Sequence, residues 1–242
     1  MQQRVGSVRG IDGRLLRWGG LAGMGSAVVA VVFNAVHPRA SSESLNDTEE
    51  LLRIVAGSGS WRLVHLASVA ATLAGVVAIV AILWSMVRRG SSRWPVVAFV
   101  VLVLTTPTLL LSVGLDGFAI KSVADRWAAA AVENRESLMA AATALRSVDV
   151  AVLDVVMIGQ FGLTAIALGA ALWSSSLFGP RIGALAIAGG LLGVVCGAMQ
   201  ALSGRLTAFS YLVLLTMSLA LFTVWLTVAS FILWRNAEEV VA

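Results

Sequence analysis

Two histidines supply the only imidazole groups in the chain, and each stands at the edge of an apolar segment. His37 ends the first such segment in FNAVHPR, and His65 lies near the start of the second in WRLVHLAS. Imidazole nitrogens bind haem iron, copper and zinc. A copper or zinc site would need a further ligand such as Asp116, so the sequence alone predicts no metal site. Two interpretations stay open: a haem- or quinone-binding redox site, or two interfacial histidines hydrogen-bonded to loop backbone.

A second chemical group is the carboxyl of Asp154, which lies within the apolar run VDVAVLDVVMIGQFG. An acid in hydrocarbon is costly and usually faces a partner or a hydrated cavity. One interpretation is a proton, cation or ligand site, as in a small proton-coupled secondary transporter. The other is a protonated or hydrogen-bonded structural acid near the membrane interface.

The stretch LDGFAIKSVADRW places Asp116 and Lys121 at the end of a third apolar segment, with Asp125 four residues after Lys121. Residues at i and i+4 of a helix are neighbours, so Lys121 and Asp125 are expected to pair. With His37 and His65 they form the most polar part of the predicted membrane region. Polar groups beside hydrocarbon are costly unless they are paired or hydrated, so the sequence predicts a ligand-sized cavity at this end.

No enzyme motif accompanies these residues. The sequence contains no GxSxG, HExxH or Walker loop, which are signatures of hydrolases, metalloproteases and nucleotide-binding enzymes. The single cysteine, Cys196, cannot form an intrachain disulfide. The sequence therefore predicts a protein that is not an enzyme and has no catalytic residue.

The composition places these groups in a membrane protein. Hydrophobic residues make up 59% of the chain and charged residues 12%, which is about half the charged share of a soluble domain. Segments of about 20 apolar residues span a bilayer as helices, and such segments are expected at residues 15–36, 63–87, 96–115, 148–173, 182–202 and 208–234. We predict an all-α membrane protein with six transmembrane helices, forming a single domain over residues 1–242.

The arginines indicate the orientation of these helices and explain the net charge of +4. Dense basic stretches lie in the N-terminal tail and at residues 88–93, and Arg235 lies in the C-terminal tail. Under the positive-inside rule these stretches face the cytoplasm, so both termini are predicted to be cytoplasmic. Because helix orientation accounts for the basic residues, no nucleic-acid partner is expected.

The two long connections on the opposite side are predicted to be helical. Residues 37–62 contain the helix-start signal DTEE at Asp47, followed by apolar residues on one face. Residues 116–147 are rich in alanine, a strong helix former. They are expected to extend the third helix outward and to return through another helix. Together the two long loops predict an outer helical cap.

Small residues recur at every fourth position of the fifth predicted helix, at Gly189, Gly193, Gly197 and Ala201. This pattern lets helix backbones approach closely. We expect packing inside the bundle along this face. A contact within a homo-oligomer or with a partner membrane subunit is the alternative.

Three local features carry a resemblance to a known group of proteins. His37 and Pro38 end the first helix, Trp61 and His65 open the second, and FGPRIGALAIAGG leads into the fifth. These features resemble uncharacterised six-helix bacterial integral membrane proteins, grouped as a domain of unknown function. The resemblance covers most of the chain and implies the bacterial cytoplasmic membrane. It implies no activity and no catalytic residues.

The leading functional hypothesis from the sequence is a non-enzymatic membrane protein that binds a lipophilic ligand or a partner subunit within the bilayer. Its candidate site residues are His37, His65, Asp116, Lys121 and Asp154. A proton-coupled transporter using Asp154 is the first alternative. A haem- or quinone-binding subunit using His37 and His65 is the second, and it is the only one that requires a cofactor. Membrane lipids are the expected partners in all three cases.

Overall fold

The computed structural model describes residues 2–38, 46–90 and 92–241, which form helices joined by short connections. In chain order the elements are α1 (Gln2–Val36), α3 (Thr48–Gly57), α4 (Trp61–Arg88), α5 (Trp94–Gly114), η1 (Leu115–Ile120), α6 (Lys121–Ala129), α7 (Val132–Val156), η2 (Met157–Thr164), α8 (Ala165–Trp173), α9 (Pro180–Ser203), η3 (Phe209–Leu215) and α10 (Thr216–Val241). The three η segments are π-helical turns that continue directly into α-helix. These described residues contain no strand, in agreement with the predicted all-α class.

Six helices of the described chain are long and apolar enough to cross a membrane. They cover residues 13–36, 61–88, 94–129, 132–173, 180–203 and 209–240. The third and fourth extend beyond their predicted spans, because α6 and the first half of α7 continue as helix past the apolar segments. The predicted all-α membrane architecture with six candidate spans is confirmed.

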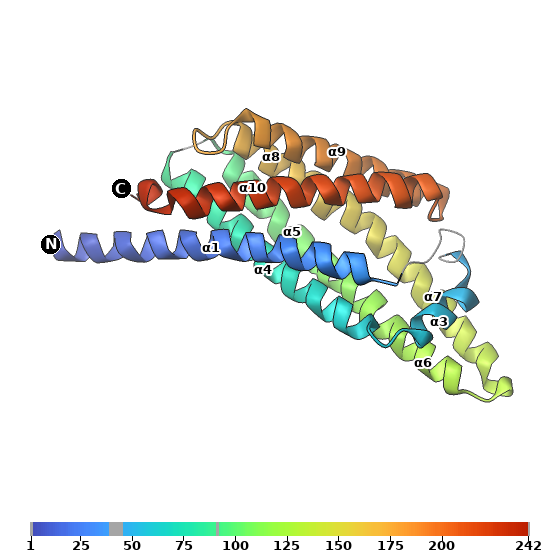
Figure 1. Ribbon diagram of the computed structural model, residues 1–242. Helices are drawn as coiled ribbons and strands as arrows, with labels where there is room; N and C mark the ends of the chain where they lie inside the picture. Colours follow the sequence, from blue (N-terminus) through green and yellow to red (C-terminus); the bar gives the residue numbers. More distant parts are fainter. Residues whose placement is uncertain (1, 39–45, 91, 242) are drawn as a thin grey trace.

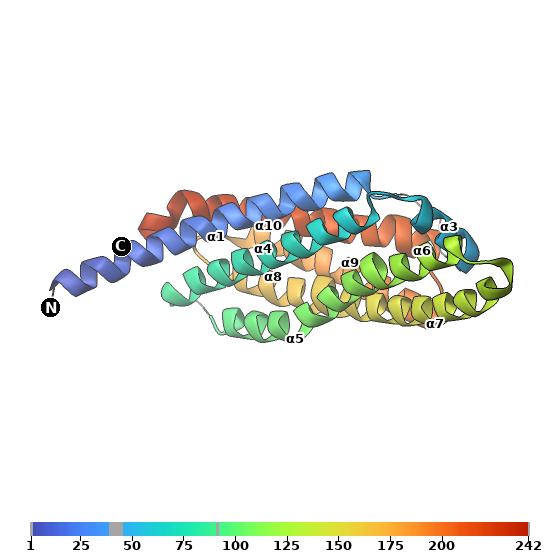
Figure 2. The same ribbon diagram turned by 90° about the horizontal axis from the view of Figure 1, so that it is seen from below.

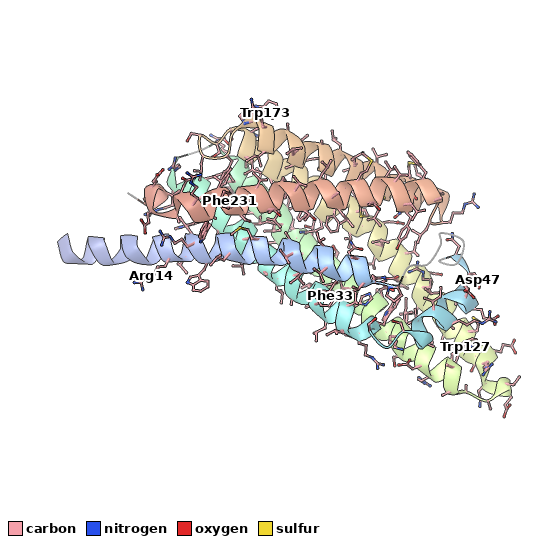
Figure 3. The ribbon with its side chains drawn as sticks, viewed as in Figure 1. Arg14, Phe33, Asp47, Trp127, Trp173 and Phe231 are labelled. Carbon is pink, nitrogen blue, oxygen red and sulfur yellow. The ribbon has the colours of Figure 1, made fainter. Side chains whose placement is uncertain are left out.

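The helices lie lengthwise beside one another, with both termini at one end of the bundle (Figures 1 and 2). α3, α6 and the start of α7 lie at the other end. Figure 3 shows Asp47 and Trp127 at this second end and Arg14 toward the first. We call α3, α6 and residues 132–145 of α7 the cap, and the end of the bundle that carries them the cap end.

Two features of the sequence favour the cap: a helix-start signal at Asp47, and apolar helix faces that can pack against one another. The carboxylate of Asp47 accepts hydrogen bonds from the backbone N–H groups of Glu49 and Glu50, which starts α3. The apolar face of α3 then packs with the start of α4 and with α6 and α7, in a core of Leu51, Leu52, Val55, Trp61, Ile120, Ala124, Trp127 and Ala142. The predicted helical cap is confirmed over the described residues, and residues 39–45 of the first connection lie outside them.

Glycines on α9 bring the helix backbones together in the bundle. A Cβ at Gly193 would lie 2.9 Å from the carbonyl of Phe161, and one at Gly197 would lie 2.7 Å from the carbonyl oxygen of Asp154. Gly189 is buried against α10, where an added Cβ would lie 3.0 Å from Cβ of Leu221. The prediction of close packing is therefore confirmed at these three glycines.

The same prediction is wrong for Ala201, which is exposed. One turn of an α-helix takes 3.6 residues, so each step of four residues rotates the position around the helix by about 40° more than a full turn. Over the three steps from position 189 to position 201 this rotation amounts to about 120°. Gln200 occupies the buried face at this level of α9 instead.

Candidate functional site

Three polar side chains from three successive spans meet at the cap end. His37 follows the end of α1, His65 lies in the second turn of α4, and Asp116 belongs to η1. Each offers one ligand atom, and these atoms all lie within 4.8 Å of one another. We call these three residues the His–Asp cluster.

Both ring nitrogens of His65 face oxygen atoms. Nδ1 lies 2.8 Å from the carbonyl oxygen of Trp61, and Nε2 lies 3.1 Å from Oδ2 of Asp116. A backbone carbonyl only accepts hydrogen bonds, so Nδ1 must carry a hydrogen. A neutral ring then presents a lone pair on Nε2 to the carboxylate, which also carries lone pairs. The contact is therefore favourable when a proton or a metal cation lies between Nε2 and Oδ2.

His37 faces the cluster in its neutral form. Its Nδ1 lies 3.0 Å from the carbonyl oxygen of Pro38, which orients the ring. Burial is the largest influence on this residue, and it lowers the pKa of His37 below the usual value of 6.5. Because the neutral imidazole is the form that binds metals, His37 is prepared as a ligand at neutral pH.

Trp61 fixes the relative positions of the two imidazole rings. Its indole stacks on His65 with ring centroids 5.0 Å apart, and it lies 4.9 Å from the ring of His37. Its Nε1 donates a hydrogen bond of 2.9 Å to the backbone carbonyl of Asp116. Since Trp61 also belongs to the apolar core of the cap, it joins the cap to the cluster.

Gly117 lets η1 approach α4 closely enough to bring Asp116 to His65. A Cβ at position 117 would lie 2.3 Å from Cβ of His65 and 2.5 Å from its Cγ, distances that would displace the ring. The π-helical geometry of η1 also inserts an extra residue into the turn that carries Asp116. Such π-helical turns are frequent at functional sites.

A buried ion pair lies behind the cluster. Arg146 donates a hydrogen bond from Nη1 to the carboxylate of Asp149, which is 3% exposed. The charge of Asp149 acts on both Asp116 and His65. The phenol of Tyr211 in η3 lies within range of the same charges. The cap end thus gathers polar groups from α1, α4, η1, α7 and η3.

The remaining two candidates from the sequence lie elsewhere. Lys121 turns toward the cap, where its Nζ donates to the carbonyl oxygens of Val55 and Ala56 at 3.0 and 3.2 Å and to Asp125 at 2.7 Å. The expected pairing of Lys121 with Asp125 is confirmed. This ammonium group satisfies the last carbonyls of α3. Asp154 lies deeper in the bundle, where α7 packs against α9.

Sequence reasoning missed the roles of Trp61, Gly117 and Asp149. Trp61 has the pattern of an interfacial tryptophan, and Asp149 has a local pairing partner in Arg146 three residues earlier. The dipeptide Asp116–Gly117 after an apolar run was the one available signal, because glycine permits a close backbone approach.

A ligand-sized groove lies in the cap. It measures about 720 Å³ and is lined by Glu49, Trp127, Arg135, Glu136, Met139, Ala140, Thr143 and Ala144. None of these residues is one of the five site candidates from the sequence. At the cluster itself, the rings of His37, Trp61 and His65 are in contact.

The His65–Asp116 pair has the spacing of two metal ligands, and the cluster does not fit haem. The third ligand atom, that of His37, lies within 4.8 Å of the other two and would move closer when an ion binds. Ligand atoms about 2.0–2.1 Å from a tetrahedral zinc ion lie about 3.3 Å from one another, close to the 3.1 Å between His65 and Asp116. Two imidazoles and one carboxylate form a donor set typical of zinc or ferrous iron with an open coordination position. Haem would require the space beside Nε2 of His65 that the carboxylate of Asp116 occupies.

Comparison of the chain with protein-family models, curated proteins and solved structures finds no match. The cluster therefore has to be interpreted from its own geometry. Its combination of one neutral imidazole, a second imidazole opposite a carboxylate, and a buried acid behind them is suited to holding a divalent cation.

Proposed function

We propose that this protein binds a divalent transition-metal ion, with zinc as the best fit, at the cap end of its membrane bundle. His37, His65 and Asp116 are the proposed ligands. The observation that carries the proposal is the placement of their ligand atoms within 4.8 Å of one another, from three separate spans. The hydrogen bond that Nδ1 of His65 makes with a backbone carbonyl is the outer support that metal-binding histidines usually have.

Charge and access also support the proposal. The carboxylates of Asp116 and Asp149 offset the charge of a divalent cation, while Arg146 partly compensates Asp149. The side chain of Asp116 is 30% exposed and that of His65 is 6% exposed. An ion therefore enters past Asp116 and reaches His65 last.

The proposal includes an orientation and a location. We place the chain in a bacterial cytoplasmic membrane with both termini in the cytoplasm, because the dense arginine stretches lie at the end of the bundle opposite the cap. The metal site then faces the outside of the cell. A site on that face takes its ion from the external medium or from a secreted partner.

Calorimetric titration with Zn²⁺ tests the proposal. The protein is purified with an affinity tag that contains no histidine, and a chelator removes bound metal before the titration. We expect one zinc ion per chain, and loss of this binding in His37→Ala, His65→Ala and Asp116→Asn. Asp125→Asn is the matched control, because Asp125 contacts Lys121 and Arg62 in the cap and does not touch the cluster. Size-exclusion profiles establish that each variant remains folded.

Zinc binding that survives in all three ligand variants, with unchanged stoichiometry and affinity, would exclude the cluster as the metal site. Cobalt gives a second measurement, because its visible absorption reports nitrogen and oxygen ligation directly. A cobalt spectrum that is identical in wild type and His65→Ala would exclude the proposed ligand set.

A second candidate function is binding of a lipophilic ligand or a partner subunit, and the groove in the cap favours it. The groove has the volume of a small-molecule site, and Trp127, Met139 and Ala140 give it an apolar wall beside charged residues. Native mass spectrometry tests for a retained lipid. Ala140→Trp should fill the groove and remove the lipid, whereas Val132→Trp, at an 80% exposed position outside the groove, should retain it.

A further inference from the structure

Two polar side chains are buried without hydrogen-bond partners where α7 meets α9. Asp154 is 8% exposed and its Oδ1 has no partner among the described residues. Gln200 is fully buried, and in the part of the chain that the structure describes neither its Oε1 nor its Nε2 has a partner. Buried polar groups are nearly always hydrogen-bonded to protein or to ordered water.

The two residues lie at neighbouring levels of two packed helices. Gly197 of α9 packs against the backbone of Asp154, where an added Cβ would lie 2.7 Å from the Asp154 carbonyl oxygen. Gln200 lies three residues further along α9, about one turn closer to the cap end. Cys196 is also within range of the Asp154 charge, but its thiol already donates to the carbonyl oxygen of Ser210.

Two other buried polar groups in the same bundle are hydrogen-bonded to protein. Oε1 of Gln160 accepts a hydrogen bond of 2.6 Å from Thr105. Asp149 is paired with Arg146. Nε of Arg146, Nε1 of Trp225 and Oγ of Ser230 are also buried without a partner among the described residues. Asp154 and Gln200 differ from these in combining a carboxyl with an amide on two packed helices, and water is the partner that their donors and acceptors require. A water molecule between them would accept from the amide and donate to the carboxyl.

We propose that Asp154 is a proton-exchanging carboxyl inside the membrane bundle, held next to bound water by Gln200. It lies five residues inward from Asp149, about 7.5 Å along the helix axis. In the exchange, the O–H bond of the neutral acid breaks, the proton moves to the neighbouring water, and the carboxylate keeps the electron pair. This site goes beyond metal binding at the His–Asp cluster and does not depend on it.

The surroundings of Asp154 leave proton exchange as its simplest chemistry. On α9, Cys196 lies within range of the Asp154 charge, and its thiol donates to a backbone carbonyl. η1 carries Asp116, whose charge acts on Asp149. Among the described residues, no basic side chain acts on the carboxyl group of Asp154. An unpaired charge in hydrocarbon is costly, so taking up a proton is the least costly response.

Reaction with the apolar reagent dicyclohexylcarbodiimide tests the proposal on the wild-type protein, because this reagent modifies protonated carboxyls in apolar surroundings. Peptide mapping by mass spectrometry should find Asp154 modified, and the rate should fall as the pH rises and the acid loses its proton. Asp125→Asn, at a carboxyl of the cap, is the matched control and should leave the modification of Asp154 unchanged. Asp154→Asn should remove it.

Two further results complete the test. In Gln200→Leu the pH of half-maximal modification should move upward, because the amide no longer helps to stabilise the carboxylate through water. Absence of modification at Asp154 over the whole pH range would overturn the proposal. Modification that is blocked by sodium ions, and that does not respond to pH, would also overturn it, since it would indicate a cation site. Neither outcome bears on zinc binding, so the two proposals fail separately.

Discussion

Nε2 of His65 lies 3.1 Å from Oδ2 of Asp116, although the two residues are 51 positions apart in the chain. The opposite nitrogen of the same ring is already committed to the carbonyl oxygen of Trp61. A cation must therefore lie between the imidazole and the carboxylate for the contact to be stable, and in the absence of metal that cation is a proton. Metal binding then displaces this proton.

Because zinc displaces a proton from the His65–Asp116 pair, zinc affinity should fall as the solution is made more acidic. His37 should add a second proton only at a pH below 6.5, because burial lowers its pKa. Calorimetry in buffers of different ionisation enthalpy measures the number of protons released. An affinity that is constant between neutral and acidic pH would contradict the displacement of a proton by zinc.

Trp61 should report metal binding by its fluorescence. Its ring stacks on His65 and lies beside His37, so a bound cobalt ion should quench its emission. Quenching should disappear in Trp61→Phe. Trp173→Phe is the control, since Trp173 lies at the end of the fourth span away from the cap (Figure 3). If Trp61→Phe is quenched as strongly as wild type, cobalt binds somewhere else.

Gly117 should be required for the cluster although it is not a ligand. In Gly117→Ala the new methyl group would collide with the ring of His65, and zinc affinity should fall by about 10- to 100-fold, as it does when the outer support of a metal ligand is lost. Gly114→Ala, three residues earlier, meets no atom within 4 Å and should bind zinc normally. Titration of both variants measures the difference, and equal affinities would show that the ring is not held by η1.

The glycine stripe on α9 should determine stability. In Gly193→Leu the side chain would be forced against the backbone of Phe161 and Gly162, which should cost about 1–3 kcal/mol or more. Gly25→Leu has open space around its Cβ position and should unfold at nearly the wild-type temperature. Thermal unfolding of the two purified variants makes the comparison. Similar melting temperatures would indicate that Gly193 is not in a tight helix contact.

Cysteine labelling should establish the orientation in the membrane. Arg89→Cys lies at the end of α4 remote from the cap, and Ser58→Cys lies just after α3 in the cap. An impermeant thiol reagent added to intact cells should label position 58 and leave position 89 unlabelled. The native thiol of Cys196 is buried and adds little background. The reverse labelling pattern would place the termini and the arginines outside.

Much of the architecture follows from the amino-acid sequence by itself. Spanning helices need only length and apolar composition, which are local properties, so the six segments could be located without knowing their neighbours. The start of α3 at Asp47 and the pairing of Lys121 with Asp125 are equally local, since each depends on residues within one turn of helix. The presence of two histidines at one end of the bundle also follows from the order of the segments.

Only the tertiary structure determines which of these residues come into contact. Asp116 meets His65 because π-helical η1 and Gly117 set the rotation and approach of the third span, and neither is visible in hydrophobic periodicity. Lys121, on the next turn, faces α3 instead. On α9 the rotation of a four-residue repeat around the helix exposed Ala201 and buried Gln200. Contacts between distant segments depend on such rotations and distances, which single-helix patterns do not contain.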